Sequence, residues 1–173
     1  MGKIETEYLK YFWPMRHYLV TCGSTSRPNI ISISFCMPVS REPPLISCAV
    51  GRKAWSCELI RRTEEFTVNV PFRDMRKAVL YCGFHSGRVT DKFRGTGLTP
   101  VPGRRISVPA IGECAAHMEC RLVDSLETGD KILFIGRVVE AYADEAVDEG
   151  LQSAEYASGS FPEEIYGVRF SRK

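Results

Sequence analysis

The chain has 173 residues, a length that accommodates one domain of ordinary size and leaves little room for a second. Hydrophobic residues make up 44% of it and charged residues 25%, which is typical of a globular protein, and no apolar run approaches the length that crosses a bilayer. The formal net charge is +2, from 23 basic and 21 acidic residues, and this near balance argues against nucleic-acid binding. We expect a single domain over residues 1–173, with neither a membrane nor a nucleic acid as partner.

Cysteine usage favours a reducing compartment. The 7 cysteines include no Cys-x-x-Cys pair, and no apolar signal segment precedes them, so a secreted disulfide framework is disfavoured and a cytoplasmic protein is expected. His117 lies between Cys114 and Cys120, but on an extended strand these three side chains do not share one face. We therefore expect no metal site.

The first half of the chain contains short β-rich runs that end at Pro or Gly. Strands are expected over 18–22, 29–37, 45–50 and 66–70. In the second of these, Ile31 and Ile33 alternate with Ser32 and Ser34, which predicts one apolar face and one polar face, and Pro38 is expected to end the strand.

Helical spacing follows two of these strands. One helix is expected within 51–62, with Trp55, Leu59 and Arg62 on one side, and another over 74–81, which Gly83 should stop. The stretch 84–111 is rich in Gly and Pro and reads as a loop.

The second half is expected to contain a long hairpin. Strands over 114–126 and 131–143 are separated by four residues that suit a tight turn. An acidic helix over 144–155 and a last strand over 165–170 would follow. Six or seven strands with two or three short helices predict a mainly β fold, a barrel or sandwich carrying a few helices.

The connection Gly51-Arg52-Lys53-Ala54-Trp55-Ser56 is a candidate phosphate site. Amide N–H groups at the start of the helix would face this turn, and Arg52, Lys53 and Ser56 add a bidentate donor, a point charge and a hydroxyl. The alternative is that the two cations are merely solvated and Ser56 caps the helix.

Two further segments could complete a ligand site. The strand from Asn29 to Ser34 offers hydrogen-bonding groups in a row, which suits the rim of a flat heteroaromatic ring, although a water-facing polar side is the ordinary alternative. The segment 81–93 mixes glycines, a histidine, cations and aromatic residues, as a loop that folds over a ligand would, or as an inert surface loop would.

Several blocks occur in an order and spacing that resembles a known family. They are Pro28-Asn29-Ile30-Ile31-Ser32, Pro43-Pro44-Leu45-Ile46, Gly51-Arg52-Lys53-Ala54-Trp55-Ser56 and Glu65-Phe66-Thr67-Val68-Asn69-Val70-Pro71. Together they resemble the flavin reductase-like family of FMN-binding split-barrel proteins, which includes flavoredoxins and ferric reductases. Ser86-Gly87-Arg88 with Asp91-Lys92-Phe93 is similar to that family's flavin-covering loop, and the predicted hairpin resembles its closing hairpin. The similarity covers roughly residues 15–145.

The resemblance implies a homodimer of six-stranded Greek-key barrels, with FMN bound near the subunit interface. Carried across by position, the FMN-binding residues would be Asn29, Ile30, Ile31, Ser32, Ser47, Cys48, Arg52, Lys53, Trp55, Ser56, Ser86, Gly87 and Lys92. The C-terminal segment 144–173 matches no part of the family pattern and is a candidate for a dimer contact.

The resemblance also implies an NAD(P)H-dependent reductase that passes electrons through FMN to flavin, ferric iron or a protein acceptor. Two alternatives stay open, an electron carrier of the flavoredoxin type and a flavin-binding domain without turnover. No catalytic residue is assigned. As hypotheses, Lys92 would add positive charge near the ring, His85 would lie near the donor site, and Cys48 would take part in redox chemistry.

Overall fold

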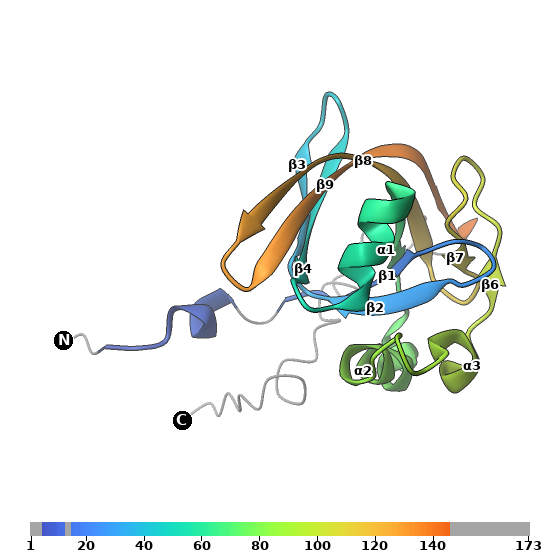
Figure 1. The fold of residues 1–173 in the computed structure, drawn as a ribbon, viewed down its shortest axis with the longest axis horizontal. Coiled ribbons are helices and arrows are strands. Elements are labelled where there is room, and N and C mark those ends of the chain that lie inside the picture. Colours follow the sequence, from blue (N-terminus) through green and yellow to red (C-terminus); the bar gives the residue numbers. More distant parts are fainter. Residues whose placement is uncertain (1–4, 13–14, 146–173) are drawn as a thin grey trace.

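The computed structural model describes residues 5–12 and 15–145 and is built around one large antiparallel sheet (Figure 1). Its seven strands have the order β2-β1-β5-β8-β9-β4-β3. They are β1 (Tyr18–Cys22), β2 (Asn29–Ile33), β3 (Cys36–Ser40), β4 (Leu45–Gly51), β5 (Glu65–Val70), β8 (Ala116–Thr128) and β9 (Lys131–Ala143). A small second sheet pairs β6 (Pro100–Val101) with β7 (Ala110–Ile111).

The helices are α1 (Trp55–Thr63), α2 (Arg76–Phe84) and α3 (Lys92–Thr96), with short 3-10 turns η1 (Tyr8–Phe12) and η2 (Arg73–Met75). The predicted mainly β class is confirmed, but the main sheet has seven strands where the resemblance implies six.

The long hairpin of β8 and β9 curls the sheet. Each strand has 13 residues, and the pairing register shifts between Glu119 and Cys120 and again between Leu122 and Asp124. Such shifts are β-bulges, which bend a strand and increase its twist. Figure 1 shows the hairpin arching over β1 and β2, and α1 packs against β1, β2, β4 and β5. The curl therefore positions the start of α1 beside the edge strand β2.

The turn between β8 and β9 confirms the predicted hairpin. β8 continues to Thr128, so only Gly129 and Asp130 connect the two strands. Gly129 has a φ of 50°, which glycine adopts without steric cost and which two-residue hairpin turns of the primed types require.

The single strand predicted over 29–37 is wrong, because the chain forms two strands there. β2 stops at Ile33 and β3 starts at Cys36, and these two strands form opposite edges of the main sheet. Pro38 lies inside β3 instead of ending a strand. It is tolerated because β3 is an edge strand whose pairing with β4 shifts between Pro38 and Ser40.

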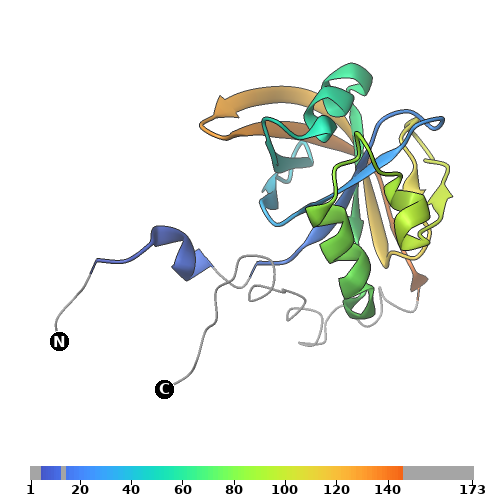
Figure 2. The ribbon, with the colours of Figure 1, turned by 60° about the horizontal axis from the view of Figure 1, so that its bottom comes forward.

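β2 is covered on both faces, which contradicts the alternative that its polar side faces water. Ile33 belongs to the inner core with Phe66 and Phe134, and Ile31 packs against that core. Ile30 faces the other way and packs in a second cluster with side chains of α2 and α3. Figure 2 shows these two helices on the side of β2 away from α1.

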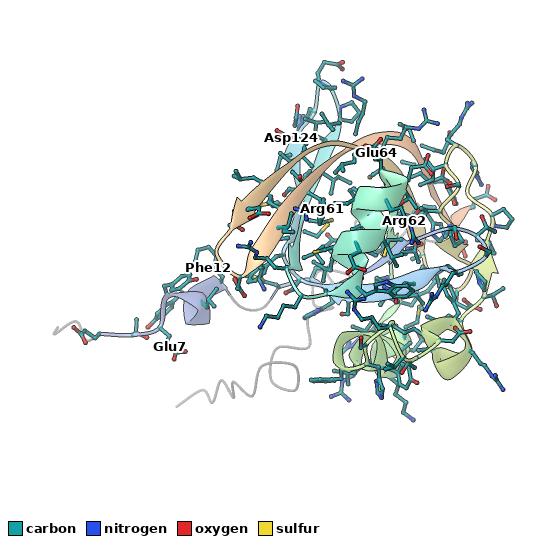
Figure 3. The ribbon with its side chains drawn as sticks, in the orientation of Figure 1. Glu7, Phe12, Arg61, Arg62, Glu64 and Asp124 are labelled. Carbon is teal, nitrogen blue, oxygen red and sulfur yellow. The ribbon has the colours of Figure 1, made fainter. Side chains whose placement is uncertain are left out.

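Both predicted helices form, with shifted ends. α1 buries Leu59 and Ile60, whereas Arg62 is exposed and does not share the buried side (Figure 3). α2 continues through Gly83 to Phe84, so Gly83 does not stop it. The predicted loop over 84–111 contains α3, β6 and β7.

The strand expected over 165–170, and the helix expected over 144–155 from residue 146 onward, lie outside the described residues. Within residues 5–12 and 15–145, no helix combines the length and the apolar character that a membrane crossing needs.

Candidate functional site

The turn between β4 and α1 leaves hydrogen-bond donors available. The amide of Ala54 donates to the Gly51 carbonyl at 2.9 Å, and that of Arg52 donates to the Asp130 carbonyl at 2.9 Å, which fixes the turn against the β8–β9 hairpin. Ala54 precedes the helix and no side chain there caps it. The Cys57 amide donates to the Ala54 carbonyl at 3.0 Å, so the amides of Trp55 and Ser56 and the positive end of the helix dipole are the groups that would meet an anion.

The two predicted cations of this turn, Arg52 and Lys53, are both exposed. The Arg52 guanidinium donates to Glu127 Oε2 at 2.9 Å and to the Gly129 carbonyl at 3.2 Å. Glu127 also accepts from Arg61 at 3.3 Å. An exposed ion pair of this kind contributes roughly 0.2–1 kcal/mol, so an incoming phosphate can replace Glu127 at little cost.

Asn29, Trp55, Ser56 and Gly87 come from three distant segments, and the fold brings them together. Asn29 Nδ2 donates to Ser56 Oγ at 2.9 Å, and both side chains are buried. A Cβ on Gly87 would lie 1.9 Å from Asn29 Oδ1 and 3.0 Å from Trp55 Cε3, so only glycine lets the 86–90 loop approach this closely. Asn29 Oδ1 is buried and has no hydrogen-bond partner among the described residues.

A polar hollow of about 480 Å³ opens beside this cluster. Its walls are Trp55, the turn before β2 with Arg27, and the loop from Gly87 to Asp91. The Arg27 guanidinium carbon lies 4.6 Å from the centroid of the Trp55 ring, a cation–π contact. The hollow is within the size range of small-molecule sites and has positive charge at its wall.

A second hollow, of about 580 Å³, is mainly apolar. Aromatic side chains of η1 and the chain around Phe35 line it, together with Ser47 of the predicted set. The predicted binding residues are thus divided, with Trp55 and Gly87 on the polar hollow and Ser47 on the apolar one.

Comparisons with known proteins identify the family to which this chain belongs. The sequence pattern of the Flavin reductase like domain matches residues 12–163. The chain belongs to the flavin reductase-like family. An uncharacterized protein of Archaeoglobus fulgidus is 34% identical over 148 residues, which cover 86% of this chain and 83% of that protein.

Two named proteins are also similar to this flavin reductase-like chain. The NADH-dependent FAD reductase of Streptomyces globisporus is 30% identical over 124 residues, covering 71% of this chain and 66% of that protein. The flavoredoxin of Desulfovibrio vulgaris (Miyazaki F) superposes with a TM-score of 0.76 at 28% identity, covering 84% of this chain and 78% of that one. The FMN-binding barrel class that the sequence suggested is therefore confirmed as the fold.

Three of the remaining predicted residues of this family member lie on the α2 and α3 side of β2. Ile30 is buried there. Ser32 faces α2, because a Cβ added to Gly83 of that helix would lie 3.7 Å from the Ser32 Cβ. The buried Lys92 ammonium donates to the Ile30 carbonyl at 2.7 Å and to the Cys82 carbonyl at 2.8 Å. Burial lowers the pKa of Lys92, and the charge is directed at two main-chain oxygens instead of a hollow.

The two hypothesised reactive residues have defined surroundings. His85 is exposed, its ring stacks on Tyr81 with a centroid distance of 3.9 Å, and its Nδ1 lies 3.0 Å from the Tyr81 carbonyl. Cys48 is buried in β4 with its Sγ 3.1 Å from Cys36 Sγ. Ser86 is exposed in the loop that carries Gly87.

Sequence reasoning missed Arg27 and Cys36. Arg27 immediately precedes the family block that begins at Pro28, but a turn arginine carries no pattern that indicates stacking on Trp55. Cys36 pairs with Cys48 across the β3–β4 hairpin, whose turn lies at residues 41–44 and whose register shifts between Pro38 and Ser40. The continuous strand predicted over 29–37 concealed that hairpin.

Proposed function

We propose that this protein binds FMN and is an oxidoreductase of the flavin reductase type. In this proposal, electrons pass from NADH or NADPH through FMN to a free flavin, ferric iron or a protein acceptor. The observation that carries the proposal is the cluster at the first turn of α1, where Asn29, Trp55 and Gly87 meet beside the positive end of the helix dipole in a flavin reductase-like fold.

The residues present fit a phosphorylated flavin. Arg52, Lys53, the Ser56 hydroxyl and the first amides of α1 would hold the phosphate. Trp55 and Gly87 would border the sugar-alcohol chain, and the unpaired, buried Asn29 Oδ1 would accept a hydrogen bond from a hydroxyl of the ligand. The apolar hollow that contains Ser47 suits a flat ring better than a phosphate.

FMN is proposed in preference to FAD because of charge. A terminal phosphate monoester carries nearly two negative charges, which the two cations of the turn match. When bound, FMN supplies a ring that accepts a hydride and releases electrons singly or in pairs. The chain's own contribution is to hold the phosphate, to orient the ring and to exclude water from one side of it.

The likeness to flavoredoxin supports a second candidate, an electron carrier with little turnover of its own. Absorption spectra of the purified protein, followed by anaerobic titration with NADH and NADPH, separate the candidates. Bleaching of a bound flavin by either nucleotide supports the reductase. Tight FMN without bleaching supports the carrier, and a colourless protein that binds neither FMN nor FAD in calorimetry contradicts both.

The phosphate assignment has a matched control. We expect the double variant Arg52→Ala and Lys53→Ala to weaken FMN binding on the order of 10- to 100-fold, because two charge-assisted contacts are lost. The double variant Arg62→Ala and Arg73→Ala removes two exposed positive charges elsewhere and should leave the affinity for FMN within about twofold. Equal effects of the two pairs would show general charge attraction only.

We also propose that the protein is a cytoplasmic homodimer, as the family resemblance implies. Large apolar side chains remain exposed, among them Tyr11, Phe12, Val123 and Leu126, and association with a second copy would bury such surface. Light scattering coupled to size exclusion measures the mass directly. A monomer at micromolar concentration would contradict the proposal.

A further inference from the structure

Cys36 and Cys48 form the closest thiol pair that the fold creates. They are direct partners in the antiparallel pairing of β3 and β4, and their sulfur atoms lie 3.1 Å apart. Both are free cysteines, as are the other five of the chain. The proximity results from the hairpin, since the two residues are 12 positions apart in the sequence.

The backbone geometry at this pair permits a disulfide. Directly opposed residues of antiparallel strands have Cα atoms about 4.5–5.5 Å apart, and disulfides form at Cα separations of about 4.4–6.8 Å. The bond itself is about 2.04 Å long, so the two sulfur atoms must approach by roughly 1 Å. Side-chain rotation supplies an approach of this size without a change in strand pairing.

Access distinguishes the two thiols. Cys36 is half-buried on the edge strand β3, whereas Cys48 is fully buried in β4. All six other cysteines of the chain are buried. An oxidant from solvent therefore reaches Cys36 before the other thiols, and the apolar core packed around the pair disfavours a bulky charged oxidant.

The hydrogen bond between the thiols favours the same order. The hydrogen bond with Cys36, together with burial, raises the pKa of the Cys48 thiol well above its ordinary value. Cys48 thus keeps its proton, which it can donate to the Cys36 sulfur, and Cys36 is left as the nucleophile.

We propose that Cys36 and Cys48 are a reversible dithiol–disulfide pair that is oxidised by peroxides reaching the half-buried Cys36. The Cys36 thiolate attacks a peroxide oxygen, the O–O bond breaks, and Cys36 becomes a sulfenic acid while hydroxide leaves. The Cys48 sulfur then attacks Cys36, the S–O bond breaks, and the released hydroxide takes the Cys48 proton to form water. Two electrons pass from the thiols to the peroxide, and a small dithiol restores the reduced pair by exchange. This chemistry does not depend on a bound flavin.

Oxidation of the reduced full-length protein by hydrogen peroxide tests the proposal. After one equivalent, we expect the intact mass to fall by two hydrogen atoms, the thiol count of the denatured protein to fall from seven to five, and peptide mapping to join the segments that contain residues 36 and 48. Dithiothreitol should restore the original mass. A bond from Cys36 to Cys120, a bond between two chains, or seven unchanged thiols would overturn the proposal.

Single variants test the order of attack. Cys48→Ser should leave Cys36 as a sulfenic acid that dimedone traps, and Cys36→Ser should protect Cys48 from oxidation. Cys82→Ser, at a buried site on α2, is the matched control and should form the disulfide at the parental rate. Equal oxidation of Cys48 in the Cys36→Ser protein would contradict the assignment. Where Cys48→Ser does not fold, as judged by circular dichroism, Cys48→Ala serves the same purpose.

Discussion

Asn29 donates a hydrogen bond of 2.9 Å to the Ser56 hydroxyl, across 27 residues of sequence. This bond joins the first residue of the edge strand β2 to the first turn of α1. It lies where the 86–90 loop comes closest, with the backbone of Gly87 against the Asn29 amide. The candidate phosphate turn and the candidate ring-binding strand are thus held in one fixed arrangement, and several predictions depend on it.

Replacing Ser56 should affect both stability and binding. In Ser56→Ala, Asn29 Nδ2 loses its oxygen acceptor while it stays buried, which costs about 1–3 kcal/mol of unfolding free energy. The affinity for FMN should fall as well, because a donor to the phosphate is removed. Urea unfolding and FMN titration measure the two effects, with the exposed Ser125→Ala as control. Parental values for both quantities in Ser56→Ala would contradict the placement.

The Gly87 contact predicts a loop variant that loses affinity. A Cβ there would overlap Asn29 Oδ1 at 1.9 Å, so in Gly87→Ala the exposed loop must move away and FMN binding should weaken, on the order of 10-fold. Gly83→Ala is the control, since its Cβ meets only the Ser32 Cβ at 3.7 Å. In a helix, that replacement should raise stability by about 0.5–1 kcal/mol. Unchanged FMN affinity in Gly87→Ala would separate this loop from the ligand.

Glu127 is expected to compete with phosphate for Arg52. In Glu127→Gln the guanidinium is released from its 2.9 Å ion pair and a negative charge leaves the turn, so FMN should bind roughly 2- to 5-fold more tightly at low salt. The gain should shrink as ionic strength rises, because the groups are exposed. Asp124→Asn removes an exposed charge farther along β8 and provides the comparison. Weaker binding in Glu127→Gln would mean that the ion pair orients Arg52 instead of competing for it.

Lys92 is predicted to stabilise the edge of the sheet. Lys92→Met leaves the buried carbonyls of Ile30 and Cys82 without their donor and should lower the unfolding free energy by about 3 kcal/mol. Lys77→Met, at an exposed position of α2, should change it by less than about 0.5 kcal/mol. A stable Lys92→Met protein with altered flavin spectra would instead assign the ammonium to the ring.

Acid should destabilise the fold through buried histidines. Burial lowers the pKa of His117 from its ordinary 6.5, and the Arg104 charge lowers it further, while burial lowers the pKa of His17. Below about pH 6.5 the unfolded chain therefore binds protons that the folded chain does not. The unfolding free energy should fall as pH drops from there through the lowered folded pKa values. Urea titrations at about pH 7.5 and about pH 5.5 measure this loss, and His117→Gln should reduce it. An equal loss in His117→Gln would assign the effect to other groups.

Much of the fold was predictable because local patterns decide it. β-rich runs bounded by turn residues predicted the extents of β1 and β9, and the pair Gly129 and Asp130 marks the hairpin turn. The break at Ser34 and Phe35 was not predictable, because the local sequence there favours extended backbone on either side. What stops β2 is the path of the chain, which crosses from one edge of the sheet to the other.

The sequence alone determined the mainly β class, the turn and helix that follow β4, and the family resemblance, since each depends on residue type and short-range spacing. Only the tertiary structure decided that Gly87 lies against Asn29, that Lys92 faces two carbonyls, and that Cys36 lies beside Cys48. These contacts join residues 10 to 62 positions apart, and they depend on strand register and on the curl of the sheet. A one-residue change of register would direct the side chains of Asn29, Cys36 and Cys48 to the opposite face of the sheet, which is why composition and spacing cannot decide these contacts.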